Sequence, residues 1–192
     1  MGKSVEIRWH ARGGQGAKTA ALLLAEAAAA AGLQIQGFPE YGPERMGAPM
    51  LAFNRISHEK ISIHSGVENP DIVMVLDPSL IGKTGITDGV SEEGVVIINT
   101  PKTPREMRQR LGITYGRVYT LDANQIALET IGRAIPNTPM MGALIKVAGI
   151  MDFPRFLEVM KEQLQEKFRS KREVIEGNVK AIERAYQEVQ GE

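Results

Sequence analysis

The sequence predicts an α/β fold with three layers, α/β/α, around a mixed, mostly parallel, Rossmann-like sheet and with a helical C-terminal part. The first 38 residues read as strand, glycine-rich turn, helix and strand. Nearly continuous apolar runs follow at residues 71–77 and 95–100, and such runs are typical of central strands covered on both faces. From Thr138 onward the strand pattern stops and helical segments follow.

The N-terminal segment has the pattern of a βαβ unit. Residues 4–9 alternate apolar and polar side chains, which predicts a strand with one buried face. His10 to Gly16 form a glycine-rich turn, and the Ala/Leu-rich residues 17–31 predict a helix that can lie close to the sheet. Residues 33–38 alternate again, and a right-handed crossover would place this second strand parallel to the first.

The middle of the chain predicts further strands and short helices. Residues 39–49 contain three prolines and two glycines and are expected to form a loop. Residues 50–57 and 60–64 are expected to be two strands of an antiparallel hairpin. The remaining elements are a sixth strand at 117–121 and short helices at 104–111 and 123–131.

Residues 138–190 are expected to form the closing helices of a single domain that spans residues 1–192. The expected helices are 139–151, 153–168 and 171–190, with Asn137 or Thr138 as the first cap. The last helix carries an apolar stripe with four-three spacing, made of Ile175, Val179, Ile182, Tyr186 and Val189. We expect the stripe to cover this chain's own core, and docking on a partner subunit is the alternative.

Composition excludes several function classes. Lys plus Arg equals Asp plus Glu, 23 against 23, whereas a nucleic-acid-binding protein usually has a basic excess. The chain has no cysteine, so disulfides, thiol catalysis and cysteine-ligated clusters are excluded. No apolar run approaches the roughly 20 residues that span a bilayer. We therefore expect a cytoplasmic protein that does not bind nucleic acid or membranes.

No catalytic residue and no metal ligand is predicted. The three histidines, His10, His58 and His64, lack metal-ligand spacing. No nucleophile can be matched with a base, and no Gly-Asp-Gly…Asn pattern of a thiamine diphosphate–magnesium site occurs. Any chemistry is therefore expected to involve groups outside this chain.

The glycine-rich turn is the main candidate for a binding site. A turn between the first strand and the first helix exposes backbone N–H groups, and the positive end of the helix favours anions such as phosphate. A tight turn that needs positive φ and binds no ligand is the alternative. The candidate residues are Arg12, Gly13, Gly14, Gln15, Gly16 and Lys18.

Neither common nucleotide motif fits this turn. The P-loop pattern fails because Arg12 and Ala17 stand where its two glycines belong. Gly14 and Gly16 match the dinucleotide fingerprint, but Thr19 replaces its third glycine. The sequence therefore gives only a weak Rossmann signal.

A second candidate is the loop at residues 40–49. It follows the second predicted strand and should emerge at the same sheet edge as the glycine turn, where ligand clefts form. Arg45 and Glu44 are the candidate polar contacts. An ordered loop with a structural Arg–Glu pair is the alternative.

Four segments in order resemble the gamma chain of pyruvate and 2-oxoacid:ferredoxin oxidoreductases. They are EIRWHARGGQGAK, FPEYGPERMGAP, ENPDIVMVLDPSLI and IPNTPMMGAL. The resemblance covers residues 4–150 and is strongest to the pyruvate or branched-chain type. Met46 and Ala48 depart from the family's pattern, which leaves the 2-oxoacid open.

The resemblance implies a subunit without cofactors in a larger enzyme. The complex would convert a 2-oxoacid and coenzyme A to acyl-CoA and carbon dioxide and reduce ferredoxin. Thiamine diphosphate and magnesium would lie between alpha and beta subunits, and iron–sulfur clusters in beta and in a ferredoxin-like delta subunit. The glycine turn and Arg45 would contact coenzyme A or a partner subunit.

Other functions stay open from the sequence. A small subunit of an indolepyruvate or 2-oxoglutarate oxidoreductase would have a related sequence. A stand-alone Rossmann-like nucleotide-binding protein, or a scaffold without a ligand, would belong to a different class.

Overall fold

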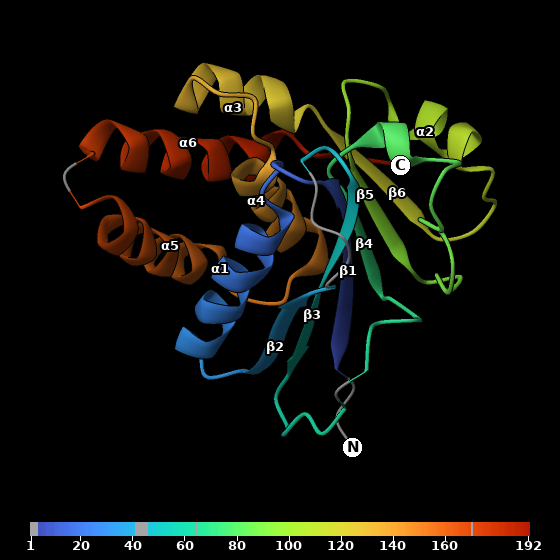
Figure 1. Ribbon diagram of the computed structural model, residues 1–192, viewed down its shortest axis with the longest axis horizontal. Helices are drawn as coiled ribbons and strands as arrows, with labels where there is room; N and C mark the ends of the chain where they lie inside the picture. The colour runs from blue at the N-terminus through green and yellow to red at the C-terminus, as the bar shows by residue number, and fades with distance from the viewer. Residues whose placement is uncertain (1–3, 41–45, 64, 170) are drawn as a thin grey trace.

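A computed structural model describes residues 4–40, 46–63, 65–169 and 171–192 (Figure 1). In chain order its elements are β1 (Val5–Arg12), α1 (Ala17–Ala30), β2 (Gln34–Pro39), β3 (Pro49–Ser57), β4 (Ile72–Val75), a 3-10 turn (Pro78–Leu80), β5 (Val95–Asn99), α2 (Pro104–Leu111), β6 (Arg117–Leu121), α3 (Ala123–Ile131), α4 (Asn137–Ala148), α5 (Phe153–Phe168), α6 (Arg172–Glu188) and β7 (Gln190–Gly191). None of the helices in these ranges is long and apolar enough to cross a membrane.

The sheet is mixed, as predicted, with the order β2-β3-β1-β4-β5-β6-β7. Strands β1, β4, β5 and β6 are parallel to their neighbours in this group. Strand β3 is antiparallel to both β1 and β2, and β7 is antiparallel to β6. The predicted α/β class with a central sheet between helices is confirmed.

The two helical layers are unequal (Figure 1). Helices α1, α3, α4, α5 and α6 lie on one side of the sheet, over the larger apolar core. Helix α2 and the loop after β4 cover β4, β5 and β6 on the other side, over a smaller core. Among the described residues no helix lies on the second face of β1 and β3, and irregular segments around Gly66 and residues 85–88 contact it instead.

The predicted hairpin at residues 50–57 and 60–64 is wrong. Strand β3 pairs with β2 on one side and with β1 on the other, so neither of its edges can take another strand. Residues 60–63 form no strand, and Ile63 is 52% exposed. His64 lies outside the described residues.

The predicted βαβ unit is correct in direction but not in pairing. Strands β1 and β2 run parallel, but β3 lies between them. The first strand is also longer than predicted, because β1 pairs with β3 as far as Arg12 opposite Pro49. His10 and Arg12 are therefore strand residues and not part of the turn.

Helix α6 packs through a narrower face than the predicted stripe. Of the stripe, Ile182 is fully buried, while the other four residues are half-buried. The buried face consists of Gly177, Asn178, Ala181, Ile182 and Ala185. The small residues of this face, Gly177, Ala181 and Ala185, allow α6 to approach α3 and α4 closely. The helix covers this chain's own core, as expected.

Two buried arginines hold irregular segments against the face of β1 and β3 on which no described helix packs. The Arg8 guanidinium donates to the backbone oxygens of Glu68, Gly85, Ile86 and Asp88. Arg55, which is 1% exposed, donates to the backbone oxygen of Gly66 at 2.9 Å and pairs with the Glu6 carboxylate. These hydrogen bonds attach the irregular segments to this face of the sheet, whereas packed helices cover the other face.

His10 accepts a hydrogen bond from Arg8 inside the same buried cluster. The Arg8 Nε lies 3.1 Å from His10 Nε2. Burial, together with the positive charge of Arg8, lowers the pKa of His10 from 6.5 to about 3. The folded protein therefore holds this imidazole neutral well below neutral pH.

We expect stability to fall as the pH is lowered from about 6.5 towards about 3 because of His10. In this window the unfolded chain binds a proton at His10 and the folded chain does not, which costs up to about 1.4 kcal/mol of stability per pH unit. Urea unfolding of the native protein and of His10→Gln across this window measures the effect. The variant should have the flatter pH dependence, and equal slopes would contradict the expectation.

Candidate functional site

The glycine-rich turn lies at the carboxyl ends of the central parallel strands. After β1 the chain crosses through α1 to β2 and β3 on one side, whereas after β4 it continues to β5 on the other side. The two directions diverge between β1 and β4, and ligands of open α/β sheets bind at such switch points. The turn after β1 and the loop after β4 meet there.

Arg12 is bound within the protein on several sides. Its Nε lies 3.1 Å from the Asp77 Oδ2. Its Nη2 donates to the Ser79 hydroxyl at 3.0 Å, and its Nη1 donates to the Gly47 backbone oxygen at 3.0 Å. Arg12 thus joins the turn after β1, the loop before β3 and the loop after β4.

Gln15 completes this connection from the turn itself. Its Oε1 accepts from the Arg12 backbone N–H at 2.8 Å, and its Nε2 donates to the Asp77 Oδ2 at 3.0 Å. The other Asp77 oxygen accepts from the Ser79 backbone N–H at 2.8 Å and caps the 3-10 turn. Asp77 therefore holds three separate donors.

The Asp77 carboxylate stays ionised in this setting. Partial burial acts to raise the pKa of Asp77, but hydrogen bonds from Ser79 and Gln15 and the charge of Arg12 lower it below its ordinary value. The negative charge of Asp77 offsets the positive charge of Arg12. Arg12 is thus less available to an outside anion than the sequence suggested.

Gly13 and Gly16 set the backbone path of the turn. Gly13 exchanges backbone hydrogen bonds with Ala48 and Gly47, at 2.9 and 3.1 Å. Gly16 has a φ of 82°, and a Cβ placed there would lie 2.6 Å from the Asn137 side-chain nitrogen. Only glycine fits this position, because it needs positive φ and a close approach to α4.

The beginnings of α1 and α4 therefore meet at Gly16 and Asn137. Neither helix has a side-chain cap or an acidic residue in its first turn. The predicted cap at Asn137 or Thr138 is wrong: α4 begins at Asn137 after Pro136, and the Thr138 hydroxyl bonds to Asn178 on α6 instead. Two positive helix ends converge on one spot, which favours an anion there.

Two further predicted residues of the turn, Lys18 and Gly14, are exposed to solvent. Lys18 is exposed in the first turn of α1, and no ion pair to it occurs among the described residues. Gly14 is also exposed, with a φ of 96°. Arg45 lies outside the described residues.

The structure thus brings together Arg12, Gly13, Gly14, Gln15, Gly16 and Lys18. It adds Asp77 and Ser79, which sequence analysis missed, and Asn137, which sequence analysis named only as a helix cap. A signal for Asp77 was present, since it is the first charged residue after the apolar β4 segment. Polar residues directly after a buried parallel strand lie at the edge where clefts form.

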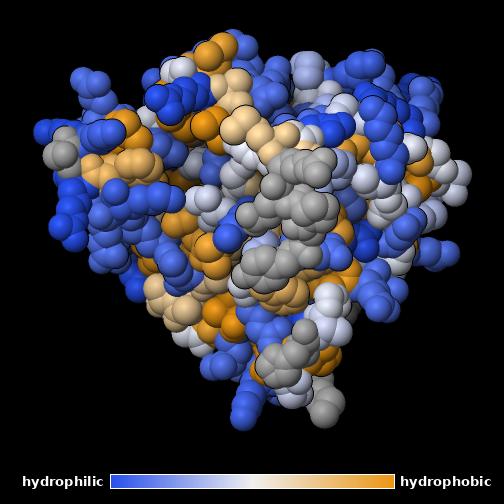
Figure 2. Space-filling view, in the orientation of Figure 1, coloured by the Kyte–Doolittle hydropathy of each residue, from blue (hydrophilic) through white to orange (hydrophobic). Residues whose placement is uncertain are grey.

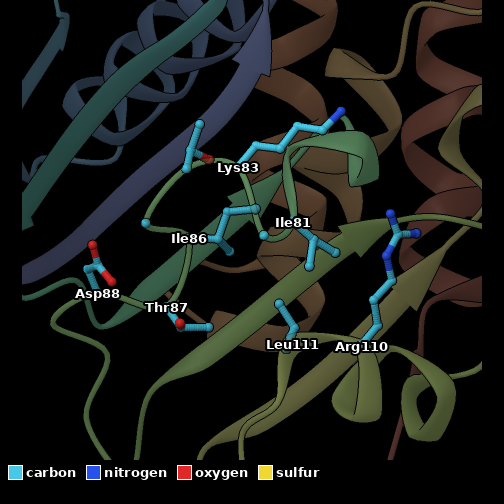
Figure 3. A pocket seen from close by; sticks show the side chains of 10 residues that line it. Ile81, Lys83, Ile86, Thr87, Asp88, Arg110 and Leu111 are labelled. Atoms are coloured by element: carbon cyan, nitrogen blue, oxygen red, sulfur yellow. The ribbon is translucent and has the colours of Figure 1, made fainter.

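Two hollows are lined by residues outside the turn. One, of about 320 Å³, lies between residues 81–88 and the end of α2, with Lys83 and Arg110 around Ile81, Ile86 and Leu111 (Figure 3). The other, of about 530 Å³, is lined by residues 100–102, 120–122 and 187–190. Neither is lined by a residue of the glycine turn.

The described residues contain no group of three or more His, Cys, Asp or Glu that could hold a metal ion. What the turn offers is backbone N–H groups, two helix N-termini and an exposed lysine. This arrangement suits binding of an anionic group or of another protein surface.

Comparison with known proteins identifies the family. Residues 6–188 match pyruvate ferredoxin/flavodoxin oxidoreductase. The chain is 49% identical to pyruvate synthase subunit PorC of Thermotoga maritima over 189 residues, 97% of this chain and 95% of that one. It is 42% identical to the pyruvate/ketoisovalerate oxidoreductases common subunit gamma of Pyrococcus abyssi, over 97% of each chain.

A solved structure agrees with this result. The crystal structure of pyruvate oxidoreductase subunit PORC from Thermotoga maritima superposes with a TM-score of 0.85 at 46% identity and covers 98% of both chains. The keto/oxoacid ferredoxin oxidoreductase gamma subunit from Geobacter sulfurreducens shares the fold, with a TM-score of 0.74 at 21% identity. The chain belongs to the pyruvate ferredoxin/flavodoxin oxidoreductase family.

Proposed function

We propose that this chain is the gamma subunit of a 2-oxoacid:ferredoxin oxidoreductase complex that acts on pyruvate or a branched-chain 2-oxoacid. The strongest support is that the matches to subunits named PorC or gamma cover at least 95% of this chain and at least 95% of each relative. The complex would convert the 2-oxoacid and coenzyme A to acyl-CoA and carbon dioxide, with reduction of ferredoxin. The alternative is the small subunit of an indolepyruvate or 2-oxoglutarate enzyme.

In this proposal the reactive centres belong to partner subunits in the cytoplasm. Thiamine diphosphate and magnesium lie with the alpha and beta subunits, and iron–sulfur clusters with beta and delta. The gamma chain is an accessory subunit that is inactive alone. Anaerobic purification of the native complex, followed by mass spectrometry of its subunits, tests this assignment, and a chain that never copurifies with larger oxidoreductase subunits would overturn it.

We propose further that the glycine turn shapes the approach of coenzyme A, which carries phosphates. The turn lies at the switch point between β1 and β4, and two helix N-termini without side-chain caps meet beside it. Lys18 and the backbone near Gly14 are the exposed groups for a phosphate contact. Arg12 acts differently: held by Asp77 and Ser79, it positions the turn.

We expect Lys18→Ala in the assembled complex to raise the KM for coenzyme A roughly tenfold, because a charge-assisted contact contributes about 1.5 kcal/mol or more. Arg12→Ala should also raise this KM, since the turn loses its anchor. Decarboxylation of the 2-oxoacid measured without coenzyme A should be unchanged in both. Lys60→Ala is the matched control, because Lys60 is exposed and follows β3 at the opposite end of the sheet from the turn.

The same variants test the architectural alternative, in which the turn contacts the alpha or beta subunit. In that case Lys18→Ala and Arg12→Ala would loosen subunit association and leave the kinetics of coenzyme A unchanged in the complex that remains. Unchanged kinetics with intact association would contradict both roles.

A stand-alone nucleotide-binding protein is a separate class with its own test. Thermal unfolding of the isolated chain with NAD, ATP or coenzyme A reports binding, because a ligand that binds only the folded state raises stability. Strong stabilisation by NAD would favour the nucleotide-binding class over the gamma-subunit proposal.

A further inference from the structure

Strand β2 forms one edge of the sheet and pairs only with β3 (Figure 1). No strand in the described residues pairs with its outer side. The opposite edge is different, because it is formed by the two-residue strand β7, and very short edge strands are one way in which proteins avoid further pairing. An edge strand presents a row of backbone donors and acceptors that another strand can pair with.

The pairing register identifies which groups β2 presents. The Glu40 N–H donates to the Leu51 oxygen at 3.0 Å, in continuation of the β2–β3 register. Hydrogen-bonded pairs alternate in an antiparallel ladder, so Gln36 and every second residue around it face β3. Ile35 and Gly37, which lie between them, direct their N–H and C=O groups to the outer side.

This edge lacks the features that usually protect one. Natural edge strands carry charged side chains, prolines or bulges that block pairing. Residues 32–39 contain no charged residue, and their single proline is the last residue of β2. An uncharged edge with outward donors and acceptors is suited to pairing.

Apolar side chains of α1 extend the edge. Ala25 lies directly over β2, since a Cβ at Gly37 would be 3.0 Å from the Ala25 Cβ. On the same side of the helix, Leu22 is 41% exposed and Ala29 is exposed. Figure 2 shows apolar side chains at the lower left, where Figure 1 places β2 and the end of α1.

We propose that two copies of this chain pair through β2, antiparallel about a two-fold axis at Gln36, so that their sheets become continuous. Ile35 of each copy would then lie opposite Gly37 of the other, and the outward donors and acceptors match. Leu22 and Ala29 of the two α1 helices would meet beside the joined strands. A second copy is the occupant because the edge is complementary to itself about this axis, as a two-fold interface requires.

Gln36→Glu gives a selective test. Within one chain, Arg55 Nη1 donates to the Gln36 Oε1 at 3.3 Å, so a glutamate there keeps a favourable neighbour and the fold. Across the axis, two glutamates would lie directly opposite each other, which is destabilising. We expect the dimer dissociation constant to rise about fivefold in Gln36→Glu, measured by sedimentation equilibrium on the full chain.

Two exposed leucines test the part of the interface formed by α1, one as the test residue and one as its control. Leu22→Arg should also weaken the dimer. Leu128→Arg, on α3 and 50% exposed, should not. A dimer that neither Gln36→Glu nor Leu22→Arg weakens would overturn the proposal, and so would a full-length chain that stays monomeric at all concentrations.

Hydrogen exchange separates a second copy from another subunit. The Ile35 and Gly37 amides should be protected in the isolated dimer and in the assembled complex. Protection in the complex alone would show that a different subunit covers β2, and it would overturn the proposal.

Discussion

Replacing Arg8 by Met should lower the free energy of unfolding by about 3 kcal/mol or more, because removing one partner of a buried charged network leaves the other polar groups unpaired. Arg8 is 6% exposed. Its guanidinium donates to backbone oxygens, at 3.1 Å for Ile86 and 2.6 Å for Asp88. In the part of the chain that the structure describes, no helix packs on this part of the sheet, and the Arg8 guanidinium is the side chain that attaches residues 85–88 to it.

Urea unfolding measures this loss, and two variants control for it. Arg8→Lys keeps the charge but has fewer donors in a different geometry, so its stability should lie between those of the native protein and Arg8→Met. Arg105→Met, at an exposed position of α2, should change stability by less than about 0.5 kcal/mol. A loss below about 1 kcal/mol in Arg8→Met would contradict the role of Arg8 in anchoring residues 85–88.

Gly142→Ala should destabilise the protein by about 2 kcal/mol or more, because overpacking a close contact costs this much. Gly142 lies inside α4, where alanine normally favours a helix by about 1 kcal/mol. A Cβ there would lie 2.3 Å from the Ile182 backbone oxygen and 3.1 Å from the Ala185 Cβ. The close contact between α4 and α6 therefore reverses the usual sign.

Thermal and urea unfolding of Gly142→Ala test this sign directly. Gln187→Ala, at an exposed position of α6, is the control and should be nearly neutral. An increase in stability in Gly142→Ala would mean that α4 and α6 are farther apart than described.

Local patterns predicted most elements but not how the strands pair. The helices at 104–111, 123–131 and 153–168 and the strand at 117–121 have the predicted bounds, because their caps, proline and periodicity are local signals. The neighbour of β3 is not a local property. Residues 60–64 alternate like a strand in sequence. Because β3 already pairs on both edges, residues 60–63 cannot pair with it.

The candidate site was predicted in part for the same reason. The glycines mark the turn after β1, and that signal is local. The partners of Arg12 are distant in sequence: Asp77, Ser79 and Gly47 lie more than 30 residues away. A cation that looks available to a ligand in sequence can therefore be bound within the fold.

The position of β3 between β1 and β2 bears on how the chain is made. Both N-terminal strands find their partners only from Pro49 onward, because β1 pairs with β3 and β4 and β2 pairs with β3. Without the residues from Pro49 onward, β1 and β2 therefore have none of the strand partners that they have in the finished sheet. Among the elements that precede Pro49, only helix α1 can form from contacts within that segment.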